Sequence, residues 1–142
     1  MKKMNKLFAL ILCFAMLAML AGCGSKPVEN TSDAVTYPAD GSVVGEGAKS
    51  FTLEVVDKEG NKTTYTVNTD ETTVGAALLG LNLLEGEDGD FGLYVKSVLG
   101  MPLDFEKDGM YWAFYIDGEY GMTGLDMTDI VPGTVYTLKA EK

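Results

Sequence analysis

The chain has 142 residues, about the length of one domain, and carries 11 Lys and no Arg against 21 Asp and Glu, a formal net charge of −10. It contains no His and two Cys, which excludes Ser-His-Asp and Cys-His catalysis and His-ligated zinc or haem. The acidic balance also argues against a nucleic-acid-binding protein, because like charges repel the phosphate backbone.

A lipoprotein signal peptide is predicted at residues 1–22. Three lysines precede the apolar run Leu7–Leu20, which is shorter than the roughly 20 residues that span a bilayer. The run ends in Leu20-Ala21-Gly22-Cys23, and small residues before a Cys are typical of a bacterial lipoprotein cleavage box. We expect a diacylglycerol on Cys23 and an exported protein anchored to the outer face of the cell membrane. An ordinary secretory signal or an uncleaved anchor is the alternative.

Residues 23–49 are predicted to be the lipidated Cys followed by a flexible tether. The segment is rich in Gly, Pro, Ser and Asp, and its isolated valines form no hydrophobic face. Cleavage would remove three lysines and no acidic residue, which leaves a mature chain with a net charge of −13. Its only Cys would be Cys23, so no internal disulfide can form, and residues 50–142 must fold on their hydrophobic core alone.

The folded part is predicted to open with a β-hairpin. Phe51–Val55 alternates apolar and polar residues, and Thr63–Val67 alternates again with β-branched and aromatic residues. Between them, Asp57–Asn61 has the composition of a turn.

A helix is predicted over Val74–Leu84, where apolar residues recur at helical spacing. Asp70, Thr72 or Thr73 can serve as its N-cap, and Glu85-Gly86 gives a stop signal. Two internal glycines weaken the helix by about 1 kcal/mol each and indicate close packing on a sheet.

More strands are expected after the helix. The acidic stretch Glu85–Asp90 is predicted to be a solvated loop, because it lacks the ligand spacing of a calcium-binding EF-hand loop. Strands are predicted at Phe91–Leu99, Met110–Ile116 and Thr134–Ala140. Asp117-Gly118 is a hairpin signal that should pair the middle one with a short strand near Tyr120. The order β-β-α-β-β-β predicts an α+β, β-grasp-like fold with one helix packed across a mixed sheet.

The spacing of Met and Asp residues in the sequence gives little support for a metal site or a catalytic site. The four methionines outside the signal segment are scattered, whereas a copper site needs them grouped. Asp104 with Asp108, or Asp126 with Asp129, could pair for glycoside hydrolysis, but they lie in turn-like segments rather than facing a cleft. We therefore expect a binding protein and no enzyme.

Aromatic residues crowd into the segment 91–120. On the 110–116 strand, alternation places Tyr111 and Tyr115 on one face and Trp112 and Phe114 on the other. Either both faces are covered and the rings are core, or one face forms a binding surface.

Two motifs in this region resemble a known family. Gly92-x-x-Val95-x-Ser97 followed by Tyr111-Trp112-x-Phe114 is similar to the C-terminal β-domain of transcobalamin and gastric intrinsic factor, and to the transcobalamin-like domains of Gram-positive surface proteins. The resemblance covers residues 50–142 and implies a β-grasp-like fold that binds a corrinoid such as cobalamin, with no covalent cofactor.

The resemblance also implies where the ligand would lie. Val95 and Phe114 would give apolar contacts to the corrin, and Asp90 and Gly121 would contact its amides. The full set of implied ligand-binding residues is Asp90, Phe91, Gly92, Tyr94, Val95, Ser97, Tyr111, Trp112, Phe114 and Gly121.

Two functions follow from the resemblance. The first is a surface lipoprotein that binds a corrinoid and hands it to an uptake transporter. The family's larger helical domain is absent from this chain, so the alternative is an interaction module that docks a surface protein supplying the helical half of the ligand clamp.

Overall fold

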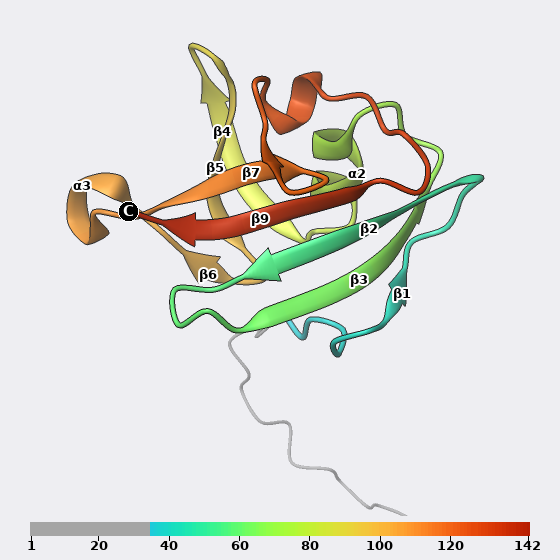
Figure 1. The fold of residues 1–142 in the computed structure, drawn as a ribbon, viewed down its shortest axis with the longest axis horizontal. Helices are drawn as coiled ribbons and strands as arrows, with labels where there is room; N and C mark the ends of the chain where they lie inside the picture. Colours follow the sequence, from blue (N-terminus) through green and yellow to red (C-terminus); the bar gives the residue numbers. More distant parts are fainter. Residues whose placement is uncertain (1–34) are drawn as a thin grey trace, which may run out of the picture. The chain divides into compact units, whose positions relative to one another are not determined.

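The computed structural model describes residues 35–142, which form one compact unit (Figure 1). The predicted signal peptide, the predicted lipidation site Cys23 and the first part of the predicted tether lie outside the described residues. Within residues 35–142, no helix is long and apolar enough to cross a membrane.

The predicted hairpin is confirmed. Strands β2 (Lys49–Val56) and β3 (Lys62–Thr69) pair antiparallel, with Phe51 opposite Val67. The turn between them is closed by the Asp57 carboxylate, which accepts the backbone N–H groups of Glu59 and Asn61, both at 2.9 Å.

This hairpin belongs to a six-stranded mixed sheet with the order β1-β3-β2-β9-β7-β8. The last strand, β9 (Val135–Glu141), lies in the middle, parallel to β2 and antiparallel to β7 (Tyr111–Ile116). A tight turn then leads to β8 (Glu119–Tyr120). Asp117 and Gly118 have φ of 48° and 84°, which is the type I′ turn that their sequence predicts.

The predicted helix is present but shorter than expected. Helix α2 (Val74–Gly80) is capped by Thr73, whose side chain accepts the N–H of Ala76. Leu84 does not extend it but begins the next strand. Gly75 explains the close packing, because a Cβ at that position would lie 2.8 Å from the backbone nitrogen of Asp126.

A second, three-stranded sheet contains β4 (Leu84–Gly89), β5 (Gly92–Val98) and β6 (Met101–Pro102). The predicted loop at 85–90 is therefore wrong, since five of the six β4 residues are exposed yet pair with β5. Such a strand shows no apolar alternation. Two short helices complete the fold, α3 (Phe105–Asp108) and the 3₁₀ helix η1 (Leu125–Met127).

The folded domain begins earlier than residue 50, so the predicted tether boundary is wrong for its C-terminal part. Strand β1 (Val43–Val44) pairs parallel with β3. The Asp40 carboxylate accepts the N–H of Thr64 at 2.6 Å, and the Tyr65 hydroxyl donates to the carbonyl of Pro38 at 2.7 Å. Tyr37 packs against the hydrophobic core.

The core lies between the large sheet, α2 and the three-stranded sheet. Phe51 and Tyr136 meet edge to face at 5.2 Å, and Tyr136 stacks on Phe114 at 6.0 Å. Leu78 of α2 and Val98 of β5 are also fully buried in this cluster. The α+β class is confirmed, and the hairpin, the helix and the central last strand give the core its β-grasp-like order.

Candidate functional site

A hollow of about 230 Å³ follows the free edge of β7, and we call it the β7 groove. It lies between β5, β7 and the loop that joins β8 to η1. Six of the ten residues predicted to bind a ligand line it: Tyr94, Val95, Tyr111, Trp112, Phe114 and Gly121. Segments distant in the sequence therefore converge on one place.

The groove exists because β8 is only two residues long. It pairs with the last two residues of β7, and the N–H of Gly121 donates to the carbonyl of Phe114 at 2.8 Å. Backbone direction alternates along a strand, so Trp112, two residues before Phe114, directs its N–H and C=O to the same edge. The groove thus combines aromatic walls with backbone donors and acceptors.

Trp112 and Phe114 are mainly core residues and present only an edge to the groove. They are 7% and 9% exposed. The indole N–H of Trp112 donates to the carbonyl of Met101 at 3.3 Å, and Phe114 stacks on Tyr136. The two sequence alternatives for the aromatic cluster both hold in part, because this face of β7 is largely buried, while on the opposite face Ala113 is buried and Tyr111 and Tyr115 are half-buried.

Tyr94 and Tyr120 form the open walls, at 42% and 56% exposed. Tyr120 is held in place from the outer face of the sheet. Its ring meets Tyr115 edge to face at 5.5 Å, and a hydrogen bond with Tyr120 raises the pKa of Tyr111 above its ordinary value.

Glu141 anchors this tyrosine group. The Tyr115 hydroxyl donates to Glu141 Oε1 at 2.7 Å, and Lys139 Nζ lies 2.9 Å from the same oxygen. Lys139 first, and Tyr115 second, lower the pKa of Glu141. The hydrogen bond to the carboxylate in turn raises the pKa of Tyr115.

Asp126 fixes the two loops at the end of the groove, and the sequence reasoning did not assign it this role. Its Oδ1 accepts the N–H of Leu93 at 3.0 Å. A Cβ at Gly92 would lie 2.8 Å from that oxygen, and one at Gly124 would lie 2.7 Å from it. Gly92 also has a φ of +101°, which L side chains rarely adopt. In the sequence Asp126 follows Gly124 closely but is 34 residues from Gly92, so only the fold brings it to both loops.

The other predicted site residues lie elsewhere. Asp90 and Phe91 form the β4–β5 turn and Gly92 begins β5, and all three line a shallow hollow of about 330 Å³ that they share with Tyr94. Ser97 is buried on β5 and lines neither hollow. The turn residues are therefore next to the groove rather than in it.

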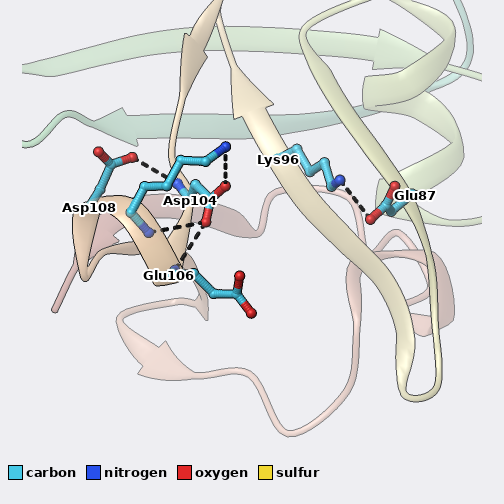
Figure 2. Close-up of polar contacts among 6 residues, drawn as sticks. Glu87, Lys96, Asp104, Glu106 and Asp108 are labelled. Atoms are coloured by element: carbon cyan, nitrogen blue, oxygen red, sulfur yellow. Dashed lines mark hydrogen bonds and ion pairs between the residues drawn. The ribbon is translucent and has the colours of Figure 1, made fainter.

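A larger hollow of about 630 Å³ lies between β5 and α3, but both lysines that line it are already paired with carboxylates. Figure 2 shows Lys96 Nζ pointing to Glu87, 2.6 Å away, and the neighbouring Asp104 carboxylate pairs with Lys107 at 3.1 Å. The Glu87 hydrogen bond raises the pKa of Lys96, and Lys107 lowers that of Asp104. An anionic ligand that used either lysine would have to break its pair.

Of the two carboxylate pairs considered for hydrolysis, Asp104 and Asp108 support α3 instead. Asp104 caps this helix by accepting the N–H of Glu106 at 3.0 Å, and Asp108 accepts the N–H of Asp104 at 2.9 Å (Figure 2). Across residues 35–142, no three or more Asp, Glu or Cys side chains gather in a way that could hold a metal ion.

Two solved protein structures resemble the fold of this chain. No family model and no curated protein matches the chain. A crystal structure of a protein from Ruminococcus gnavus ATCC 29149, described as metal binding, aligns with a TM-score of 0.63 at 26% identity, over 67% of this chain and 98% of that one. Haptocorrin in complex with Cbi aligns with a TM-score of 0.50 at 19% identity, over 66% of this chain and 25% of haptocorrin. The latter likeness shows the fold alone and supports the predicted transcobalamin-like relationship at that level.

Proposed function

We propose that this chain is a membrane-anchored surface lipoprotein that binds a corrinoid at the β7 groove and releases it for uptake, without catalysis. The observation that carries the proposal is the convergence of Tyr94, Val95, Trp112 and Phe114 on one groove. The fold shared with haptocorrin supports it, although the matched part is a quarter of that protein.

The groove suits the edge of a corrin. A corrin has a flat apolar ring with amides around its rim. The rings of Tyr94 and Tyr120 can contact the apolar surface, and the backbone of Trp112 at the free strand edge can bond the amides. At about 230 Å³, the groove is smaller than the roughly 300–1,000 Å³ pockets that enclose a ligand. We therefore expect one-sided, readily reversible binding, which fits hand-off.

The absence of His fixes how the ligand would be held. No imidazole can replace a ligand of the cobalt, so the protein would hold the corrinoid by its periphery. The visible absorption of cyanocobalamin should then keep its band positions when it binds.

The experiment is thermal unfolding of detergent-solubilised full-length protein with and without cyanocobalamin. Ligand at ten times the dissociation constant adds about 1.4 kcal/mol. For a domain of this size, that raises the melting temperature by about 6 °C. The corrinoid proposal fails if the melting temperature does not move at millimolar ligand.

Two exposed aromatic residues give a matched pair of variants. Tyr120→Ser removes one wall of the β7 groove, whereas Phe105→Ser removes an equally exposed ring at the start of α3, a residue that does not line the groove. The ligand-induced rise should shrink in Tyr120→Ser and persist in Phe105→Ser. Equal loss in both would place the ligand elsewhere.

A further inference from the structure

Two neighbouring loops each carry an apolar side chain that stands almost entirely in solvent. Phe91, in the β4–β5 turn, and Met122, in the loop after β8, are both 93% exposed. Tyr94 lies beside Phe91 in one hollow and beside Met122 and Tyr120 in the next. We call these four side chains the tip patch: Phe91, Tyr94, Tyr120 and Met122. Contiguous exposed apolar side chains of this kind mark interaction sites.

The two loops that carry the tip patch are joined by the side chain of Asp126. Asp126 accepts the N–H of Leu93, next to the β4–β5 turn, at 3.0 Å. The same carboxylate fills the space that a Cβ at Gly92 or Gly124 would take, and the Phe91 carbonyl lies 3.6 Å from the position of a Gly124 Cβ. One side chain therefore holds the two loops, and their apolar residues, at a fixed separation. Pre-organisation lowers the entropy cost of docking.

Acidic side chains border the tip patch. Glu87, Asp88 and Asp90 line the same hollow as Phe91, and Glu119 precedes Tyr120 on β8. Lys96, on the neighbouring strand β5, is paired with Glu87 (Figure 2). An apolar centre with a charged rim is the usual anatomy of a protein interface, and here the rim is negative.

The acidic rim of the tip patch argues against a lipid surface, because anionic lipids would repel it. The tip patch also lies at the opposite end of β5 from the start of the described chain, where a Cβ at Gly100 would lie 2.9 Å from the Tyr37 ring. The seven residues of β5 separate that end from Gly92 by about 20 Å, and Figure 1 shows the β4–β5 hairpin projecting from the opposite side to the domain's start.

We propose that the tip patch docks a protein partner whose surface has an apolar cleft bordered by Lys and Arg. This inference uses the predicted anchor but does not depend on which ligand the β7 groove binds. Aromatic residues and Met are enriched in interface centres, and a basic rim on the partner would complement the acidic rim here.

Site-directed cross-linking on intact cells tests it. The mature chain would have no thiol besides the acylated Cys23, so an introduced Cys can be labelled selectively. Met122→Cys in the full-length protein is coupled to a benzophenone maleimide and illuminated, and labelling is verified by mass. Glu59→Cys, exposed in the β2–β3 turn, is the matched control.

The expected result is a protein adduct at position 122 that is absent at position 59 and maps to an apolar segment bordered by Lys or Arg. Phe91→Ser should lower its yield at least tenfold, as for a central aromatic contact. Asp88→Lys with Asp90→Lys should lower it at least fivefold. Because these side chains are exposed, the variants should melt as the parent does. Adducts with lipid alone, an adduct insensitive to Phe91→Ser, or no adduct from labelled protein would each overturn the proposal.

Discussion

Replacing Asp126 by Ala should loosen the two loops that border the β7 groove and the tip patch. The carboxylate accepts the Leu93 N–H at 3.0 Å, and a hydrogen bond to a charged group contributes about 1.5–3 kcal/mol. Asp126 is only partly buried, so we take the lower end, about 1.5 kcal/mol. At about 4 °C for each kcal/mol, the melting temperature should fall by about 6 °C.

Two variants separate this contact from a general loss of charge. Asp126→Asn keeps an acceptor oxygen and should fall between Ala and the parent. Asp129→Ala removes an exposed carboxylate three residues away and should change the melting temperature by no more than about 2 °C. Circular dichroism gives the melting temperatures, and hydrogen exchange reports on the Leu93 amide. The reasoning is refuted if Asp126→Ala melts like Asp129→Ala, or if Leu93 exchange is unchanged.

Two further predictions concern the start of the domain and the outer face of the sheet. Tyr65→Phe removes the hydrogen bond to the Pro38 carbonyl, so the free energy of unfolding should fall by about 1 kcal/mol. Proteolysis within residues 35–44 should become faster. Unchanged cleavage would show that this hydrogen bond does not hold the segment. Lys139 and Tyr115 lower the pKa of Glu141 below its ordinary 4.5, so the stability it contributes is present above that pH and is lost as the pH falls toward the lowered value. Denaturant titrations at about pH 5 and pH 3 should show a smaller loss of stability in Glu141→Gln than in the parent, and equal losses would contradict this assignment.

The parts of the fold that the sequence predicted are those with a strong local signal. The β2–β3 hairpin has apolar alternation on both strands, and the side chain of its turn residue Asp57 accepts the backbone N–H of Glu59, two residues further on. The Asp117-Gly118 pair predicts the β7–β8 turn because both positions need a positive φ. In each case the short-range chemistry agrees with the tertiary structure.

The parts that the sequence missed depend on long-range contacts. Strand β4 is acidic and exposed, so only its pairing with β5 makes it a strand. The segment 35–48 is likewise held by distant contacts, such as the pairing of β1 with β3 and the hydrogen bond from Thr64 to Asp40. The local hydrophobic pattern of a segment does not reveal which distant residues it contacts.

The candidate site was predictable in outline. Alternation separated Tyr111 from Trp112 and Phe114, and the family resemblance brought β5 and β7 together. Neither could show that β8 ends after two residues and so leaves the β7 edge open. Nor could they show that Trp112 and Phe114 are largely buried.

Fluorescence of Trp112, the one tryptophan of the chain, tests corrinoid binding at the β7 groove most directly. Corrinoids absorb where tryptophan emits, so cyanocobalamin bound in the groove should quench this residue strongly. N-acetyltryptophanamide, titrated in parallel, corrects for light absorbed by free ligand. We predict saturable quenching in the full-length protein that Tyr120→Ser weakens at least fivefold and Phe105→Ser does not. Quenching that matches the free tryptophan analogue at every concentration would contradict corrinoid binding at this site.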